Sequence, residues 1–211
     1  PASGRQVWTL IDMFPGCPGM TVIGENGGIV MRDGVEVSSS PLDAPTMREV
    51  VRLVREATSG PDGIDGGLVM CGKQFAYVER TDDRFVDGVM PYYHRTKRID
   101  DQIAIIDAIE AGQIDDAIVK LAVYVIGPVQ ALAEATLANF ADTHQYAISG
   151  ANWADLQIRG VDKGSAVRDL QRFLGVDRSQ TAVFGDAGND LSMMSEGTCP
   201  SRCPTPPRTS S

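Results

Sequence analysis

The part of the chain best suited to chemistry is a short loop with the sequence GDAGND at residues 185–190. Its two carboxylates, Asp186 and Asp190, are hard oxygen ligands of the kind that Mg²⁺ prefers, usually alongside phosphate oxygens of a substrate. Gly185 and Gly188 allow the backbone to turn sharply or to approach a ligand closely. These residue types and their spacing predict a site for a divalent metal ion and a phosphate group.

The segments on either side place this loop at the end of a strand. Thr181–Phe184 predicts a buried strand and Leu191–Met194 the start of a helix. In open α/β sheets, ligands bind at the carboxyl ends of the strands. The loop also fits an ordinary Asx turn in which Asn189 or Asp190 caps backbone N–H groups. Because such turns are common, the loop by itself leaves both interpretations open.

A lysine occupies an unusual place in another predicted helix. The apolar periodicity predicts a helix over Lys163–Leu174, with Asp162 as its N-cap and Gly175 at its end. A cation in the first turn opposes the helix dipole, so Lys163 favours an anion held between its ammonium group and the helix N-terminus. The alternative is a solvated surface lysine.

The front of the chain carries two further polar loops. The first, Ser3–Arg5, has the character of a loop whose preceding strand is missing, and a helix is predicted for Gln6–Phe14. A buried strand over Thr21–Ile23 then runs into the second loop, which has the sequence ENGG at 25–28. The pair Asp33-Gly34 lies between two short apolar runs and predicts a β-hairpin.

The middle of the chain changes character after a linker-like stretch at residues 38–41. Apolar spacing predicts helices at 45–58, 100–111 and 128–141, and strands at 68–78, 118–126, 146–148 and 154–158. This succession suggests a compact α+β or α/β module of about a hundred residues. Residues 195–211 contain no aliphatic or aromatic residue and four prolines, so we expect a disordered tail.

Composition limits the classes of protein and partner. The 211 residues can form one large domain or two small ones, and 43% hydrophobic residues suffice for a core. A formal net charge of −9 argues against nucleic acid or an anionic membrane as the main partner. The four cysteines show no repeated CxxC spacing, and no apolar run reaches the roughly 18 residues of a membrane span. With no export signal at the front, we expect a cytoplasmic protein.

Three separated motifs together resemble a known family. Ser3–Arg5, Lys163-Gly164 and the GDAGND loop are similar to the second, third and fourth motifs of the haloacid dehalogenase-like phosphatases, in the Cof-type (IIB) branch. The resemblance covers about residues 1–194. It implies an α/β fold with a Rossmann-like core, formed by 1–37 and 153–194, and an inserted α+β cap of the C2 type at 38–152.

The resemblance also implies roles for the charged residues of the later motifs. Asp186 would ligate Mg²⁺, and Asp190 would support the metal site. Lys163 would neutralise the transferred phosphoryl group and steady the nucleophile. We therefore expect Mg²⁺ as the cofactor, Lys163 and Asp190 as catalytic residues, and Asp186 and Asp190 as metal residues.

Substrate-binding roles follow in the same way for the polar loops. Ser3 would hydrogen-bond the phosphoryl group, and Asn189 would help to position it. Arg5 and Asn26 would lie at the rim of the cleft, and Gly4 is expected among the substrate-binding residues. The implied partner is a small phosphorylated metabolite, most plausibly a sugar phosphate, with neither nucleic acid nor membrane involved.

The chain departs from the family pattern at the first motif. That motif, DxD followed by Gly-Thr at the end of the first sheet strand, supplies the aspartate that attacks phosphorus, and it would precede Ser3. We therefore expect a core that lacks this strand and a chain that lacks its nucleophile. Two alternatives remain beside a Mg²⁺-dependent phosphatase: a non-catalytic phosphate-binding protein and a mutase that rearranges phosphosugars. An in-frame DxD with Gly-Thr in the coding sequence upstream of Pro1 would favour an enzyme, and its absence would favour the non-catalytic protein.

Overall fold

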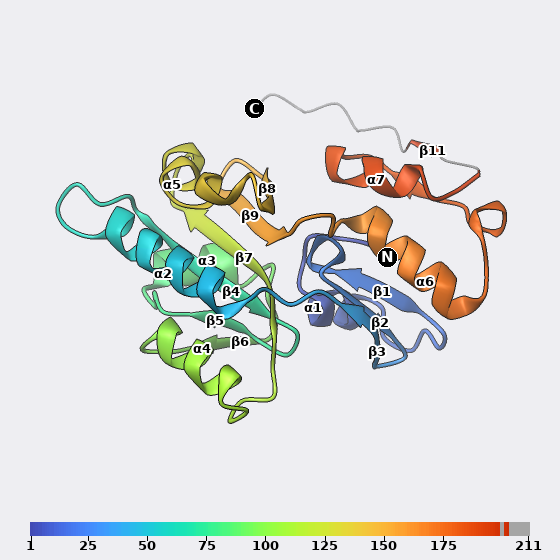
Figure 1. Cartoon of the computed structure of the whole chain (residues 1–211), viewed down its shortest axis with the longest axis horizontal. Coiled ribbons are helices and arrows are strands. Elements are labelled where there is room, and N and C mark those ends of the chain that lie inside the picture. Colours follow the sequence, from blue (N-terminus) through green and yellow to red (C-terminus); the bar gives the residue numbers. More distant parts are fainter. Residues whose placement is uncertain (199–200, 203–211) are drawn as a thin grey trace.

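The computed structural model describes residues 1–198 and 201–202. Its elements form two units joined by two chain crossings (Figure 1). We call residues 40–158 the cap unit, and residues 1–39 with 159–198 and 201–202 the core unit. No helix in the described part of the chain is long and apolar enough to cross a membrane.

The cap unit is built on a six-stranded sheet with the strand order β6-β5-β4-β7-β9-β8. All neighbouring strands are antiparallel except β5 and β6, which are parallel. The strands are β4 (Gly66–Gly72), β5 (Ala76–Val78), β6 (Thr96–Arg98), β7 (Ile118–Val125), β8 (His144–Ile148) and β9 (Trp153–Ile158).

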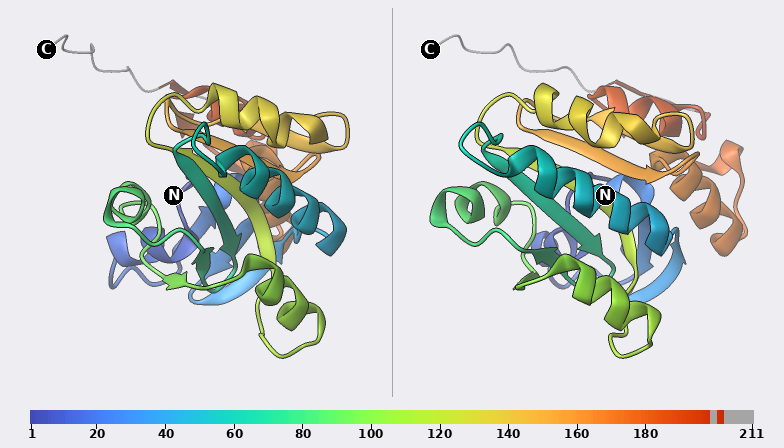
Figure 2. Two further views of the ribbon diagram at one scale, coloured as in Figure 1. Left: turned by 90° about the vertical axis from the view of Figure 1, so that its left-hand side faces the viewer. Right: turned by 60° about the vertical axis from the view of Figure 1, so that its left-hand side comes forward.

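Helices cover both faces of this sheet, as Figure 2 shows from two directions. One face packs on α2 (Ala44–Thr58), α4 (Gln102–Glu110) and α5 (Gln130–Ala135), and the short helix η2 (Leu137–Phe140) follows α5. The other face packs on α3 (Asp83–Val89), through Phe85 and Val89. The whole of β4 is therefore buried, as expected for a strand covered on both faces.

Side chains along the central strands β7 and β9 point alternately to the two faces of the sheet, and this decides which residues lie on the face beside α3. In β7, Leu121 and Val123 join the core under α2 and α5, so Lys120 and Tyr124 lie on the opposite face. In β9, Ala154 and Leu156 join the same core, so the other face carries Trp153, Asp155 and Gln157. The sheet thus presents a mixed polar and aromatic surface beside α3.

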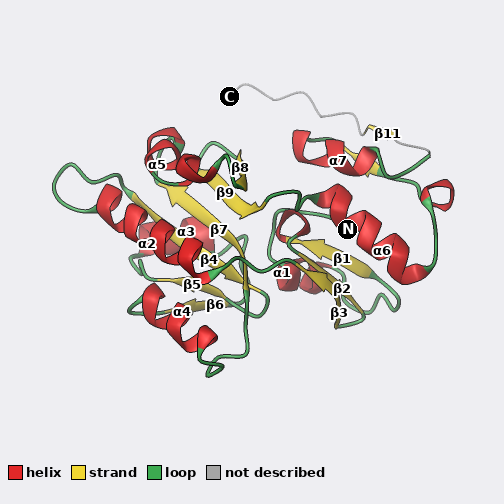
Figure 3. Ribbon diagram, viewed as in Figure 1, coloured by secondary structure: helices red, strands yellow, loops and turns green. Residues whose placement is uncertain are grey.

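The core unit is smaller and has less sheet (Figure 3). Its antiparallel sheet consists of β1 (Thr21–Gly24), β2 (Ile29–Arg32) and β3 (Val35–Ser39). One face packs on α1 (Val7–Met13), and the other packs on α6 (Lys163–Leu174) and α7 (Leu191–Met194). The first residues of the chain run parallel to β1, with a bridge from Ala2 to Ile23.

Several sequence predictions are confirmed by these elements. The helices predicted at 6–14, 45–58 and 163–174 are α1, α2 and α6. The predicted hairpin is β2–β3, and its turn residues Asp33 and Gly34 have φ angles of 50° and 80°. The strand predicted at 68–78 is two antiparallel strands, β4 and β5, because Gly72 ends the first one. Helix α3 was not predicted, since its seven residues show no clear periodicity.

Other predictions are wrong. The buried strand expected at Thr181–Phe184 is only β10 (Phe184–Gly185), and Phe184 is 61% exposed. In the part of the chain that the structure describes, β10 pairs only with β11 (Ser201–Arg202), so it lacks the two neighbours of a central strand. The strand at Trp153–Ile158, expected on the core side of a boundary at 152, pairs with β7 and β8, so we assign it to the cap unit. Because β11 falls within the tail expected at 195–211, that expectation is wrong for residues 201–202, and residues 199–200 and 203–211 lie outside the described chain.

Candidate active site

Backbone hydrogen bonds hold the two loops at the front of the chain against each other. The Ser3 amide donates to the carbonyl of Ile23 (3.0 Å), and the Ser3 carbonyl accepts from the amide of Asn26 (3.0 Å). The Glu25 amide donates to the carbonyl of Arg5 (2.9 Å), and the Ser3 hydroxyl accepts from the Arg5 amide (3.2 Å). The second loop takes the left-handed conformation at Glu25 and Asn26, with φ angles of 50° and 53°. The predicted second-motif loop is therefore a fixed structure.

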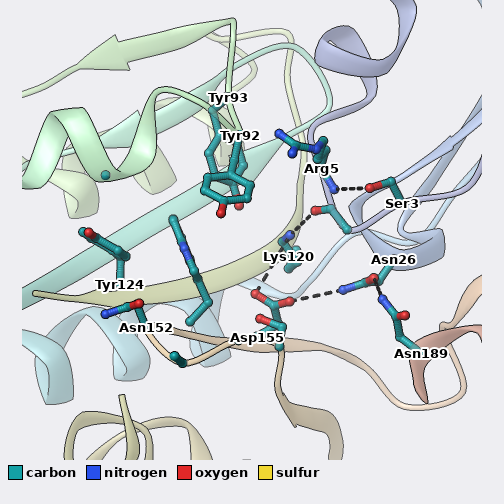
Figure 4. Close-up of a pocket in the computed structure, with 16 residues that line it drawn as sticks. Ser3, Arg5, Asn26, Tyr92, Tyr93, Lys120, Tyr124, Asn152, Asp155 and Asn189 are labelled. Carbon is teal, nitrogen blue, oxygen red and sulfur yellow. Dashed lines mark hydrogen bonds and ion pairs between the residues drawn. The ribbon is translucent and has the colours of Figure 1, made fainter. Parts of the chain in front are cut away.

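Asn26 connects three segments that are far apart in the sequence. Its Oδ1 accepts a hydrogen bond from Asn189 Nδ2 (3.1 Å), and its Nδ2 donates to Asp155 Oδ2 (3.1 Å). Figure 4 shows this chain of contacts running from the GDAGND loop, through Asn26, to the cap sheet. The predicted rim residue Asn26 is thus the link between the core loops and the cap unit.

Lys163 and Asp190 form a nearly buried ion pair beneath the loop. Lys163 begins α6, where Asp162 and Ser165 form a reciprocal capping box, and its Nζ lies 2.6 Å from Asp190 Oδ1. The other carboxylate oxygen of Asp190 accepts from the amides of Asp186 and Ala187, both at 3.0 Å. Burial alone would raise the pKa of Asp190, but the hydrogen bonds from Lys163 and the two amides lower it below its usual range.

The glycine after Lys163 is required by close packing. A Cβ atom at Gly164 would lie 2.6 Å from the carbonyl oxygen of Ser192 in α7. The Gly164 amide also donates to the Ser192 hydroxyl (3.1 Å). The KG pair therefore brings the first turn of α6 against the helix that follows the GDAGND loop, which explains how Lys163 reaches Asp190.

The GDAGND loop supplies one uncommitted carboxylate for a metal ion. Asp186 is exposed, whereas both oxygens of Asp190 are already engaged by Lys163 and the loop amides. Among residues 1–198 and 201–202, no group of three or more His, Cys, Asp or Glu residues could hold a metal ion. Since Mg²⁺ is commonly bound by one or two carboxylates together with phosphate oxygens and water, Asp186 fits part of such a site.

On the cap side, a buried charge cluster faces the core loops. Lys120 Nζ lies 2.7 Å from Glu25 Oε2 and 3.9 Å from Asp155 Oδ1, and it donates to the carbonyl of Gly4 (2.9 Å). Burial would lower the pKa of Lys120, but the carboxylates of Asp155 and Glu25 raise it. Burial raises the pKa of Glu25 in spite of the attraction of Lys120. The cluster ties β7 and β9 to both front loops.

Helix α1 provides a second connection between the units. Gln6 exchanges two hydrogen bonds with the backbone of Arg95, both at 2.9 Å, and Thr9 Oγ1 donates to the carbonyl of Tyr92 (3.1 Å). Arg5 donates to the carbonyl of Pro91 (2.8 Å). Because the first-loop residue Arg5 directly precedes α1, these contacts hold the cap segment between α3 and β6 over the loop.

Two adjoining cavities lie between the units and collect most of the predicted site residues. The first, of about 380 Å³, is lined on the core side by Ser3, Gly4, Arg5, Asn26 and Asn189. The second, of about 640 Å³, is lined by Lys163 together with Asn26 and Asn189. Asp190 lies beneath Lys163, and Asp186 lines neither cavity. The structure therefore gathers residues of all three motifs, with Asp186 at the exposed edge.

The cap wall of the first cavity was missed by the sequence analysis. It includes Lys120 and Asp155, together with aromatic residues from three cap segments. A signal was present in β7, where Lys120 is the only charged residue in the apolar run IVKLAVYV, and in β9, where Asp155 interrupts an otherwise uncharged strand. A lone charge on a buried strand needs a partner, and such residues are candidates for a site.

Comparisons with known proteins agree with this fold and these motifs. The family of haloacid dehalogenase-like hydrolases matches residues 2–198. The 5-amino-6-(5-phospho-D-ribitylamino)uracil phosphatase YbjI of Escherichia coli is 32% identical over 202 residues, covering 92% of this chain and 67% of that protein.

Solved structures give the same result at lower sequence identity. A haloacid dehalogenase-like hydrolase from B. subtilis matches with a TM-score of 0.74 and 15% identity, over 95% of this chain and 75% of its own. A subclass IIB sugar phosphatase of the same superfamily matches with a TM-score of 0.65 and 15% identity, over 95% of this chain and 72% of its own.

The protein is therefore an α/β enzyme of the haloacid dehalogenase-like class, and the chain belongs to the haloacid dehalogenase-like hydrolases. Its fold is similar to that of the subclass IIB sugar phosphatase. The resemblance carried by the three motifs is confirmed.

Proposed function

We propose that this chain carries the phosphate-binding part of a Mg²⁺-dependent phosphatase for small phosphorylated metabolites, with sugar or polyol phosphates as the substrate class. The observation that carries the proposal is the meeting of the three motifs at two adjoining cavities, where Asn26 and Asn189 line both. The names of the E. coli relative and of the subclass IIB structure, a ribitylamino-uracil phosphatase and a sugar phosphatase, support the same substrate class.

Each core residue has a role that follows from its chemistry. The Ser3 hydroxyl and the Asn189 amide donate hydrogen bonds to phosphoryl oxygens, as the neutral donors of the site. Lys163 supplies positive charge beside them, and Asp190 holds its ammonium group in place. Asp186 would hold Mg²⁺, which, when bound, neutralises charge on the phosphoryl oxygens. We therefore propose that Asp190 is a positioning residue, which holds Lys163 and the loop amides in place.

The attacking group is the part of the mechanism that this sequence does not contain. Hydrolysis in two steps needs an aspartate nucleophile, and no Asp-x-Asp occurs anywhere in the 211 residues. We therefore propose that the chain as given binds phosphate without turning it over. The second candidate is a non-catalytic phosphate-binding role. Finding an in-frame DxD and Gly-Thr in the coding sequence upstream of Pro1 would favour the enzyme.

Calorimetric titration of the purified chain with inorganic phosphate tests the binding half of the proposal. We expect Lys163→Ala to weaken binding by at least about tenfold, because a charge-assisted contact contributes about 1.5–3 kcal/mol. Lys97→Ala is the matched control, since Lys97 lies on the cap strand β6 and lines neither cavity. Equal affinity in the wild type and both variants would contradict the proposal.

Assays with p-nitrophenyl phosphate test the other half. The chain should show no hydrolysis above background, because positioning and charge neutralisation cannot replace the covalent step. Turnover that disappears in Lys163→Ala would mean that another group of this chain serves as the nucleophile.

A further inference from the structure

The cap wall of the first cavity is formed largely by aromatic rings. Tyr92 and Tyr93 come from the segment after α3, Tyr124 from β7 and Trp153 from β9, and all four line the cavity. The ring centroids of Tyr92, Tyr93 and Tyr124 lie 5.4, 6.0 and 4.8 Å from that of Trp153. We call these four residues the aromatic wall; Figure 4 shows its tyrosines on the cap side of the pocket, across from Ser3, Asn26 and Asn189.

The aromatic wall is not a closed part of the cap interior. Tyr93 is 2% exposed and belongs to the apolar cluster beside α3, but Tyr92 is 38% exposed, and Tyr124 and Trp153 are only half-buried. Aromatic rings are costly to leave in contact with water when a core could cover them. The accessible ring surface therefore points to a ligand that covers it.

The rings are held in fixed positions before any ligand binds. Tyr124 and Trp153 are direct partners in the register of β7 and β9, which places their side chains on the same face of the sheet. Phe85 of α3 packs edge-on against Tyr124 at 5.6 Å, and a Cβ atom at Gly88 would lie 2.1 Å from the Tyr124 hydroxyl. Only a glycine at position 88 lets α3 approach this ring so closely. A rigid wall of this kind loses little entropy when it binds a rigid ligand.

The opposite wall is polar, so the cavity has two chemically different ends. The core side presents Ser3, Arg5, Asn26 and Asn189. Arg5 joins the two walls, because its guanidinium lies 4.9 Å from the centre of the Tyr92 ring. A ligand that fills the cavity would need an anionic end for the core loops and a flat apolar end for the aromatic wall.

We propose that the aromatic wall is a binding site for a planar heteroaromatic ring, so that the preferred substrates are phosphate esters that carry such a ring on their leaving group. The inference rests on the proposed function, because the core loops must hold the phosphoryl group for the ring to reach the wall. The ring stacks on Trp153 and Tyr92, and Arg5 contacts the part of the ligand between the ring and the phosphate. A phosphorylated sugar without a ring would use only the polar half of the cavity.

Titration with three probes tests this division of the cavity. Uridine 5′-monophosphate carries ring, sugar and phosphate, ribose 5-phosphate lacks the ring, and uridine lacks the phosphate. We expect the full chain to bind uridine 5′-monophosphate about tenfold more tightly than ribose 5-phosphate, as stacking of one base on an aromatic side chain predicts. Uridine should bind more weakly than uridine 5′-monophosphate.

Variants assign the effect to the aromatic wall. Trp153→Leu and, separately, Tyr92→Leu should bring the affinity for uridine 5′-monophosphate close to that for ribose 5-phosphate and leave the latter unchanged. Tyr92 is a good second choice because it lies outside the strands, and the hydrogen bonds to its carbonyl use only the backbone. Tyr146→Leu is the matched control, since Tyr146 packs against the other face of the cap sheet and lines neither cavity.

Fluorescence gives a readout that loss of folding would not imitate. The chain has two tryptophans, so in Trp8→Phe the tryptophan emission comes from Trp153 alone. Uridine 5′-monophosphate should quench this emission, and ribose 5-phosphate should not. Equal affinity for uridine 5′-monophosphate and ribose 5-phosphate, or no quenching of the Trp153 emission, would overturn the inference and leave the proposed function intact. Failure of both phosphates to bind would overturn the proposed function and the inference with it.

Discussion

The cap unit and the core unit differ in how fully each buries its own apolar surface. The cap sheet has six strands with helices on both faces, and its main core is at most 5% exposed. The core sheet has three strands and two small apolar clusters. Most of the large apolar side chains that remain exposed belong to the core unit, among them Phe184 at 61% and Leu191 at 70%, on either side of the GDAGND loop.

This difference separates two tasks of the site. The predicted phosphate-binding residues lie on loops of the less completely buried unit and are positioned by hydrogen bonds, such as those of Asn26 and Asp190. The aromatic wall belongs to the well-buried unit, where Tyr124 and Trp153 lie on strands β7 and β9 and pack against each other, and Tyr92 and Tyr93 lie on the segment after α3. Under the two proposals, phosphate binding falls on hydrogen-bonded loops of the core unit, and ring binding falls on the sheet of the cap unit and the segment after α3.

Hydrogen exchange should show the largest difference between the units. Amides of Leu121–Val123 in the centre of β7 are expected to exchange only with global unfolding, whereas those of Val183–Gly185 open locally. With a global stability of about 5 kcal/mol or more, the protection factors should differ by about a thousandfold or more. Strand β2, paired on both sides, is the internal reference for the core unit.

Equal protection of β7 and β10 would contradict the contrast between the units. If β2 is protected as well as β7 while β10 is not, the weakness is confined to the neighbourhood of the GDAGND loop. That outcome would sharpen the comparison, because it would locate the difference at the strand that has only β11 as a partner in the described chain.

The buried charge cluster joins the two units, so disrupting it should produce the next largest effect, a loss of stability to unfolding. Lys120→Met would leave Glu25 and Asp155 buried without their cation, and breaking such a pair costs about 3–5 kcal/mol. Lys73→Met is the control, because the pair of Lys73 with Glu36 is exposed and should contribute at most about 1 kcal/mol. Urea unfolding measures both changes.

A double variant distinguishes lost packing from an unpaired charge. Lys120→Met with Glu25→Gln should recover part of the lost stability, since fewer buried carboxylates then lack a cation. No recovery would mean that the lysine stabilises the junction by its methylene chain and its hydrogen bond to Gly4 rather than by its charge.

Most of the local structure could be predicted from the sequence, because local signals determine it. The Asp33-Gly34 turn, the cap of α6 by Asp162 and the motif loops all depend on residues a few positions apart. The contact of Asn26 with Asp155 joins residues 129 positions apart, and no local pattern indicates it. The buried strand at 181–184 was overpredicted because an apolar run indicates burial only where neighbouring strands are present.

Acid should destabilise the core loop by a moderate amount. The pKa of Asp190 is lowered in the folded chain from its ordinary value of 3.8, so its ionised form stabilises the fold above that value. This contribution is lost as the pH falls below about 4 and through the folded pKa. Asp190→Asn should cost about 1–3 kcal/mol near neutral pH and should reduce the loss of stability on acidification. The free energy of unfolding, measured from pH 7 to pH 2, gives both the cost at neutral pH and the loss on acidification. Asp186→Asn, at the exposed neighbouring carboxylate, is the control. Identical pH profiles for the wild type and Asp190→Asn would mean that Asp190 does not cause the loss of stability.

The smallest expected effect is that of Mg²⁺. Asp186 is the one uncommitted carboxylate of the loop, so we expect weak binding, and a ligand at a concentration equal to its Kd stabilises by about 0.4 kcal/mol. Thermal unfolding with millimolar Mg²⁺ should therefore show a small shift, absent in Asp186→Ala and retained in Asp142→Ala, which removes an exposed carboxylate of the cap unit. Because the proposed ligand Asp186 belongs to the core unit, Mg²⁺ should slow hydrogen exchange in the GDAGND loop and leave exchange in β7 unchanged. Tight, stoichiometric Mg²⁺ binding that is lost in Asp186→Ala would contradict this expectation and would mean that a second carboxylate completes the site. The GDAGND loop would then be a more fixed structure than the exposed apolar residues beside it indicate.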